Sequence, residues 1–275
     1  DGLPADLRAR LAEAGVVTLQ GLDDTLSAFS AAARYPTLRA KVLADAESRL
    51  LPVPTTPSSP VVTLNEAEGK ALLAGHGIPV PTHSTGTAEE VIAASEGLGY
   101  PLAVKLLNAD LAHKNHAGAV HLNIKDASGL EQAISDIQTS VTRYDARLDT
   151  SHFLIERMVS APRAEFIAGV SHKPGIGYAL VIGRGGTAVE ELKDFATLLL
   201  PVNEAQIDDA LRGLNLTRKL CLQENEIAAL TRTITKIARF AQDTSEKLAE
   251  LDVNPILLDA GGGVTAVDAY LRISD

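Results

Sequence analysis

Two apolar segments near the C-terminus restrict the fold more than any other part of the chain. Residues 249–258 and 264–268 are separated only by Asp259–Gly263, which ends in three glycines. A connection this short joins antiparallel strands, because parallel strands need a crossover of a dozen or more residues. The strand candidates 153–158 and 164–170 are equally close together. The pattern therefore predicts an α+β fold with mixed or antiparallel sheets.

The C-terminal hairpin also places polar side chains together. Side chains alternate between the faces of a strand, so Asp252 and Asn254 point the same way. A turn centred on Gly261 would put Asn254 opposite Asp268. Oxygen-bearing side chains on a rigid sheet suit Mg²⁺, which takes one or two carboxylates plus substrate phosphates. The alternative is a hairpin with polar residues on its solvent face.

Composition describes an ordinary globular protein. The 275 residues are 45% hydrophobic and 22% charged, with a net charge of −10 and no cluster of Lys and Arg, which argues against a nucleic-acid partner. The single cysteine, Cys221, excludes an intrachain disulfide and suits a reducing compartment, so we expect a cytoplasmic protein. No apolar run is long enough for a membrane span, and no membrane partner is expected.

Proline-rich residues 51–63 predict an extended linker between two parts of the chain. Residues 1–50 predict a helix over 4–14, a strand over 16–19 and a helix over 22–35, too little for an independent core. The chain starts at Asp1, and we expect it to be a piece of something longer. Residues 64–275 form the main domain, where Asn65 and Thr87 are typical helix caps. Further helices are expected over 127–144, 204–214 and 226–241, and further strands over 101–107, 118–124 and 178–182.

Several polar residues interrupt the expected strands and loops. Lys105 lies within an apolar strand, so it faces an anion or a carboxylate unless it extends to solvent from an edge. The following loop carries His113, Lys114 and His116, which suit phosphate contacts or phosphoryl transfer to a histidine, or simply a solvated loop. Zinc is disfavoured because further Cys or His ligands are missing.

Two later segments offer weaker signals. Residues 183–186 form a glycine-rich loop after a strand, which permits close approach of backbone N–H groups to a phosphate but equally suits a hairpin loop. The acidic residues behind it, Glu190, Glu191 and Asp194, suit a metal, a base or an exposed turn. The strand end at 155–159 is a place where a nucleotide base can dock, with Glu165 near enough in sequence to hold ribose hydroxyls.

Taken in order, these segments resemble the ATP-grasp domain of NDP-forming acyl-CoA synthetases, a superfamily that includes ADP-forming acetyl-CoA synthetases and succinyl-CoA synthetases. The resemblance covers residues 64–273, and residues 1–50 resemble the end of the flavodoxin-like CoA-ligase domain that precedes this module in fused enzymes. The order of the motifs carries it: the Asn65 helix, Tyr100–Lys105, His113–Lys114, Glu156–Val159, Glu165, Gly183–Gly186 with Glu190, Leu251–Pro255 and Ala266–Asp268.

The resemblance implies an ATP-grasp fold, in which two α+β subdomains clasp ATP, and a role for each motif. Lys105 would contact ATP phosphates, with Lys114 beside it. Glu156, Met158 and Val159 would line the adenine pocket and Glu165 the ribose. The remaining roles are phosphate cover by Gly183, Gly185 and Gly186, Mg²⁺ binding by Asn254, Asp268 and Asp252, phosphoryl transfer through His113, and a catalytic role for Glu190.

The implied reaction is carboxylic acid + CoA + ATP giving acyl-CoA + ADP + phosphate. CoA and the acid would bind mainly to domains outside this chain, and the CoA-binding and phosphohistidine domains would belong to the same protein or to a partner subunit in an oligomer. Two departures from the family pattern indicate another acyl substrate or a weaker phosphoryl relay. The His-Lys loop has His116 for an aspartate and Ala119 for a glycine, and the strand after Gly169-Val170 continues as His172-Lys173-Pro174 where the family often has Asp-Pro.

Two other functions fit the same residues. A carboxylate–amine ligase of the ATP-grasp type would share Lys105 and the metal hairpin but would need no phosphohistidine. A nucleotide-sensing module would bind ATP tightly without transferring phosphate.

Overall fold

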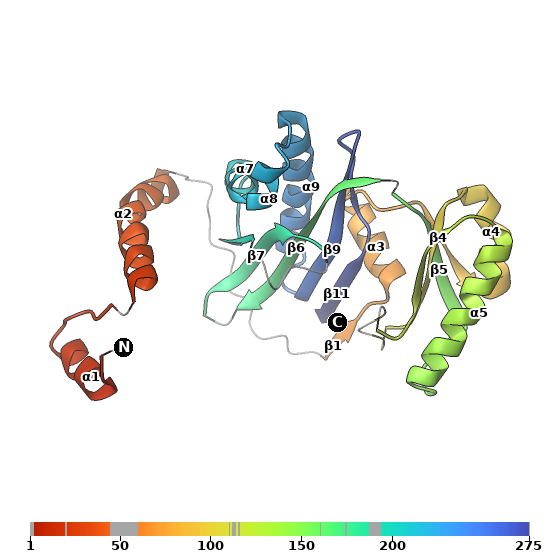
Figure 1. Cartoon of the computed structure of the whole chain (residues 1–275), viewed down its shortest axis with the longest axis horizontal. Coiled ribbons are helices and arrows are strands. Elements are labelled where there is room, and N and C mark those ends of the chain that lie inside the picture. The colour runs from red at the N-terminus through yellow and green to blue at the C-terminus, as the bar shows by residue number, and fades with distance from the viewer. Residues whose placement is uncertain are drawn as a thin grey trace. The chain divides into compact units, whose positions relative to one another are not determined.

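The computed structural model describes residues 3–19, 21–44, 60–109, 111, 114, 116–159, 161–173, 175–186 and 194–274. The chain divides into two units, Asp1–Arg49 and Leu50–Asp275 (Figure 1). Among the described residues, no helix is both long enough and apolar enough to cross a membrane.

The N-terminal unit contains two helices, α1 (Ala5–Glu13) and α2 (Leu22–Ala44). The predicted strand over 16–19 is wrong, because these residues have no regular structure and Val17 is 83% exposed. A strand needs a neighbour for its backbone hydrogen bonds, and the described part of this unit supplies none. Its assignment to a flavodoxin-like domain stays a prediction.

The second unit has two lobes, each built on an antiparallel sheet, which confirms the predicted α+β class. The sheet of the larger lobe runs in the order β1-β11-β9-β6-β7-β8, with β10 paired to β9. Its strands are β1 (Val61–Thr63), β6 (Pro162–Lys173), β7 (Gly177–Arg184), β8 (Phe195–Leu199), β9 (Leu248–Asp259), β10 (Val264–Ala266) and β11 (Ala269–Ser274). Strand β1 lies within the predicted linker, because the edge of β11 offers it hydrogen-bond partners that a local pattern does not reveal.

The helices of the larger lobe are α3 (Glu66–Gly75), α7 (Glu204–Gly213), α8 (Asn215–Lys219) and α9 (Glu224–Asp243). The apolar stripe of α9 at Ile227, Leu230, Ile234 and Ile237 is buried in the core against the sheet, as the helical spacing predicts. Helix α3 begins at the predicted cap, where Asn65 and Glu68 satisfy each other's backbone N–H groups. This cap fixes where Glu66 lies.

The sheet of the smaller lobe runs in the order β2-β5-β3-β4 and is covered by two helices (Figure 1). Its elements are β2 (His83–Thr87), α4 (Ala88–Leu98), β3 (Leu102–Leu106), β4 (Val120–Ile124), α5 (Ala127–Tyr144) and β5 (His152–Arg157). Strand β3 lies between β5 and β4, so the predicted buried strand is central in its sheet.

The C-terminal hairpin has the predicted register. Val264 pairs with Leu258 and Ala266 with Ile256, which centres the turn on Gly261. The same register continues as Ala269 pairs with Val253, and the Asn254 N–H donates to the Asp268 carbonyl at 3.1 Å. Asn254 therefore lies opposite Asp268, as the sequence predicts.

Candidate functional site

A cavity of about 840 Å³ opens between the two lobes of the second unit, within the usual size range of small-molecule sites. Its wall combines the start of α3, strands β3 and β4 and the end of β5 with residues of β6, β9 and β11. It contains these predicted site residues: Lys105, Lys114, Glu156, Met158, Val159, Glu165, Asp252, Asn254 and Asp268. Motifs spread over more than 160 residues thus meet at one place.

The period-2 pattern of the smaller sheet explains why charged residues face this cavity. On β3, Leu102, Val104 and Leu106 pack into the core beneath α4 and α5, so Lys105 points from the opposite face. On β5, Phe153 and Ile155 occupy the same core, which turns Glu156 towards Lys105. Glu156 is paired with Ala103, two residues before Lys105, so the two charged side chains are diagonal neighbours.

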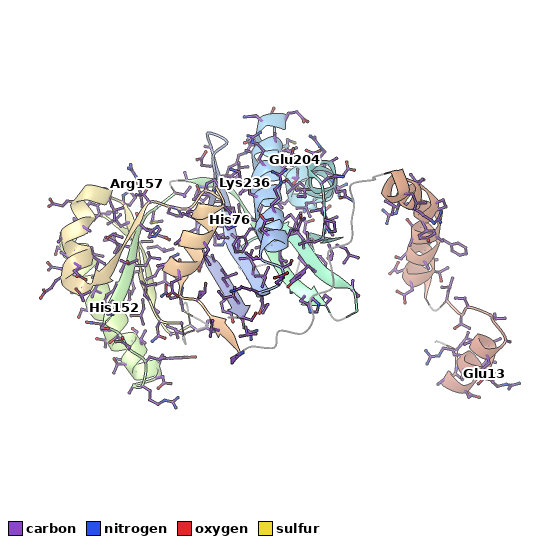
Figure 2. All side chains as sticks on the ribbon, turned by 180° about the vertical axis from the view of Figure 1, so that it is seen from behind. Glu13, His76, His152, Arg157, Glu204 and Lys236 are labelled. Carbon is purple, nitrogen blue, oxygen red and sulfur yellow. The ribbon has the colours of Figure 1, made fainter. Side chains whose placement is uncertain are left out.

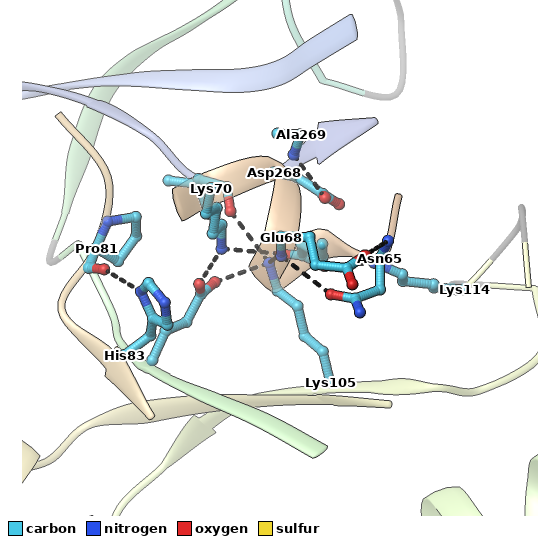
Figure 3. Close-up of polar contacts among 12 residues, drawn as sticks. Asn65, Glu68, Lys70, Pro81, His83, Lys105, Lys114, Asp268 and Ala269 are labelled. Carbon is cyan, nitrogen blue, oxygen red and sulfur yellow. Dashed lines mark hydrogen bonds and ion pairs between the residues drawn. The ribbon is translucent and has the colours of Figure 1, made fainter. Parts of the chain in front are cut away.

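A buried ring of four charged side chains joins the two lobes (Figure 3). The Lys105 Nζ donates to Glu66 Oε1 at 2.6 Å and to Glu156 Oε1 at 2.7 Å. The Lys70 Nζ completes the ring, since it lies 2.8 Å from Glu66 Oε1 and also contacts Glu156 Oε2. We call Glu66, Lys70, Lys105 and Glu156 the ion-pair ring. Glu66 and Lys70 come from α3, whereas Lys105 and Glu156 come from the smaller sheet.

Two further contacts tie the ring to the cavity. Lys114 donates to the second carboxylate oxygen of Glu66, and Lys105 donates to the Val267 carbonyl at 3.2 Å. Lys105 is therefore not a lysine that reaches solvent from an edge strand; its side chain is 5% exposed and faces two carboxylates. Of the two alternatives that the sequence leaves open for Lys105, the structure shows the pairing with buried carboxylates.

The ring shifts the pKa of two of its members, Glu66 and Lys105. Burial disfavours the ionised form of Glu66, but attraction by Lys105, Lys70 and Lys114 outweighs it and holds the pKa of Glu66 far below its usual value. Burial likewise disfavours the charged form of Lys105, but Glu66, Glu156 and Asp268 outweigh it and raise the pKa of Lys105 above its usual value. The two carboxylates of the ring and Asp268 therefore favour the ammonium form of Lys105.

The hairpin carries a second set of polar groups on the same cavity. Burial and the charge of Glu66 raise the pKa of Asp268, although three lysines act against this. Burial, with the charges of Glu250 and Asp268, raises the pKa of Asp252. A bound cation would offset the repulsion between these like charges. Among the described residues there is no group of three or more His, Cys, Asp or Glu placed to hold a metal, so a cation here would also need oxygen from Asn254 and from outside the chain.

Met158, predicted to bind the base, and Glu165, predicted to bind the ribose, lie on different parts of the cavity wall. Met158 is held at the end of β5, because its N–H donates to the Pro101 carbonyl at 3.1 Å and its sulfur accepts from the Asn123 N–H at 2.9 Å. Glu165 lies on β6, next to the glycine-rich loop.

Gly183, Gly185 and Gly186 do not lie on the cavity wall as described. Gly185 donates its N–H to the Glu165 carbonyl at 2.8 Å, and a Cβ at Gly186 would lie 3.0 Å from a Glu165 carboxylate oxygen. The loop therefore packs beside Glu165, and its role in covering phosphates stays a prediction.

Two predicted catalytic residues, His113 and Glu190, lie outside the described residues. Asp194, the other acidic residue with an open assignment, accepts from the N–H groups of Asn215 and Leu216 at 2.7 and 2.8 Å. It caps the start of α8, which is a structural role.

Sequence reasoning missed Glu66 and Lys70. Their spacing of four residues on a capped helix places them on one face, which was the available signal. Nothing local indicates that this face is buried, since the partners that cover it, β11 of the larger sheet and Glu156 of the smaller one, are distant in sequence.

Comparison with known proteins agrees with this geometry. A family model described as an ATP-grasp domain matches residues 57–273. The chain is 30% identical over 212 residues to the beta subunit of the ADP-forming acetate–CoA ligase II of Pyrococcus furiosus, covering 75% of this chain and 89% of that subunit. It is also 30% identical over 217 residues to the ADP-forming 4-hydroxybutyrate–CoA ligase of Nitrosopumilus maritimus, but spans only 31% of that longer protein.

The fold has a close counterpart among solved structures. A crystal structure of a protein from Pyrococcus horikoshii superposes with a TM-score of 0.72 at 28% identity, covering 78% of this chain and 92% of that one.

Proposed function

The chain belongs to the ATP-grasp domain family, and on that premise we propose that it is the nucleotide-binding and phosphoryl-transfer part of an ADP-forming acyl-CoA synthetase. The relatives named above are ADP-forming acid–CoA ligases or their beta subunits. The single observation that carries the nucleotide part is the pair Lys105 and Lys114 on the wall of an interlobe cavity, opposite the hairpin carboxylates. Ammonium groups beside a cation site are what a polyphosphate requires.

The remaining roles are those that the resemblance implies, for residues that lie on the cavity wall. We assign the base to the wall formed by Glu156, Met158 and Val159, and the ribose hydroxyls to Glu165. Asn254, Asp252 and Asp268 would hold Mg²⁺, which when bound offsets the negative charge of the phosphates. The oxygen donors fit this ion, because burial and mutual repulsion already disfavour two uncompensated carboxylates.

In the step proposed for this chain, a ring nitrogen of His113 attacks the γ-phosphorus of ATP. The N–P bond forms while the bond from phosphorus to the β–γ bridging oxygen breaks, and ADP leaves. Glu190 is proposed to assist this step. CoA and the carboxylic acid would bind on domains carried by the rest of the protein or by a partner subunit, in an oligomer located in the cytoplasm. The N-terminal unit is proposed to be the end of such a CoA-ligase domain.

Phosphate on His113 is the test of this step. We expect the chain, incubated with ATP and Mg²⁺, to acquire an acid-labile phosphate that mass spectrometry places at His113 and that His113→Ala abolishes. His121→Ala is the matched control, since this histidine lies on β4 and does not line the cavity, and it should keep the label. A chain that binds ADP but never carries phosphohistidine would contradict the synthetase assignment and favour a ligase without a histidine relay or a nucleotide sensor.

A further inference from the structure

Lys70 is the one member of the ion-pair ring that does not line the cavity. Its side chain is 0% exposed, and its ammonium contacts Glu66 and Glu156. A buried ion pair often adds little to stability compared with apolar side chains of the same volume. A lysine in this position therefore calls for an explanation beyond packing.

The geometry of the ring shows what Lys70 does to its neighbours. Glu66 and Glu156 both contact Lys105, so without Lys70 two buried carboxylates would share one ring ammonium. With Lys70 present, each of the two carboxylates contacts both ammonium groups of the ring, Lys70 and Lys105. Lys105 is thereby held between α3 of the larger lobe and β5 of the smaller lobe (Figure 3).

Lys70 also changes the charge that the cavity presents. The ring, Lys114 and the neighbouring Asp268 together contain three ammonium groups and three carboxylates, so their charges balance when all are ionised. Removal of Lys70 would leave one net negative charge. Attraction of an anion to a cavity depends on the sum of such fixed charges, because they act through a wall of low dielectric.

We propose that Lys70 is a positioning residue for phosphate binding, which acts through Glu66 and Glu156 to hold Lys105 and to balance the charge of these two carboxylates. This inference rests on the proposed function, because the anion in question is the phosphate chain of the nucleotide. Lys70 itself touches no ligand in this account; its effect is transmitted by the two carboxylates.

The test compares ADP binding, in the presence of Mg²⁺, among four forms of the chain by calorimetric titration. Lys70→Met removes the charge and keeps most of the side-chain volume. Lys70→Arg keeps a positive charge between the two carboxylates. Lys236→Met is the control, since this exposed lysine lies on α9 and donates to the Gly77 carbonyl, away from the ring (Figure 2).

We expect Lys70→Met to weaken ADP binding by roughly tenfold or more, which is the scale of one charge-assisted interaction. Lys70→Arg, which keeps the charge, should bind ADP at least about threefold more tightly than Lys70→Met does, and Lys236→Met should bind as the wild type does. Rescue by the charged variant distinguishes positioning from packing, because arginine is bulkier than methionine and would not relieve a packing defect at Lys70.

Each other outcome decides the matter. Wild-type affinity in Lys70→Met, or loss of binding that persists to the same extent in a folded Lys70→Arg chain, would overturn the proposal. If Lys70→Met does not fold but Lys70→Arg folds and binds ADP, the proposal is supported, since the buried positive charge is then what the site requires; if neither folds, it is overturned. A folded wild type that does not bind ADP would instead refute the proposed function.

Discussion

Replacement of Lys105 by methionine should weaken ADP binding by between about tenfold and a hundredfold. The variant removes an ammonium that is fixed at the cavity wall by two carboxylates and the Val267 carbonyl. A charge-assisted hydrogen bond to phosphate is stronger than a neutral one, and a phosphate oxygen would take the place of one of the three acceptors that Lys105 has in the structure. Calorimetric titration with ADP and Mg²⁺ measures the effect.

Lys219→Met is the control for this prediction. It removes an exposed ammonium from α8 that does not line the cavity, and its ADP affinity should equal that of the wild type. Thermal unfolding of each variant shows whether the chain is folded in the titration. A folded Lys105→Met chain with unchanged ADP affinity would remove Lys105 from the phosphate site.

Replacement of Glu66 by alanine should lower the free energy of unfolding by about 3–5 kcal/mol at neutral pH. Glu66 is fully buried and contacts Lys70, Lys105 and Lys114. Its removal leaves these three ammonium groups in place, with Glu156 as the remaining carboxylate of the ring. Breaking one side of a buried ion pair costs more than the pair contributes, because the remaining charges cannot return to water. Urea unfolding at pH 7 measures the loss.

The effect of Glu66 should depend on pH in a defined direction. Its pKa is lowered in the folded chain, so its stabilising contribution is complete above the unfolded pKa of about 4.5 and is lost as pH falls below that value. The difference between wild type and Glu66→Ala should therefore shrink as the pH is lowered from 5 towards 3. Glu96→Ala, at an exposed position of α4, should change stability by less than about 0.5 kcal/mol at either pH. An equally small change in Glu66→Ala would contradict the ring as a stabilising contact.

Much of the fold was predictable where local chemistry decides it. Asn65 and Thr87 cap α3 and α4 with their side chains, so both helices begin where the sequence predicts. The helix over 127–144 matches α5, because its apolar residues recur at helical spacing and Asp126 caps it. The hairpin register follows from one short glycine turn.

Other elements depend on distant partners, which local patterns do not contain. Strand β1 forms because the edge of β11, more than 200 residues away in sequence, pairs with it. Residues 16–19 have a strand-like composition but no partner in the described part of their unit, and they form no strand. Short strands such as β8 and β1 are decided in the same way by the sheet edge beside them.

The candidate site likewise contains residues that the sequence predicts and residues that it does not. Lys105 and the hairpin residues were predicted because an isolated lysine in an apolar strand and oxygen donors across a hairpin are visible in sequence. Glu66 and Lys70 were missed because their burial depends on partners distant in sequence, β11 of the larger sheet and Lys105 and Glu156 of the smaller one. The resemblance predicts that the glycine-rich loop covers the phosphates, and in the described residues Gly185 and Gly186 of this loop pack beside Glu165.

The central claim is that a nucleotide binds in the interlobe cavity with Mg²⁺ at the hairpin. Calorimetric titration of the wild-type chain with ADP, with Mg²⁺ and with a chelator in its place, tests it most directly. The account predicts one binding site per chain and weaker binding when Mg²⁺ is removed, because Asp252 and Asp268 then face the phosphates without a cation between them. A folded chain that binds no ADP, or that binds it equally well without the metal, would contradict the account.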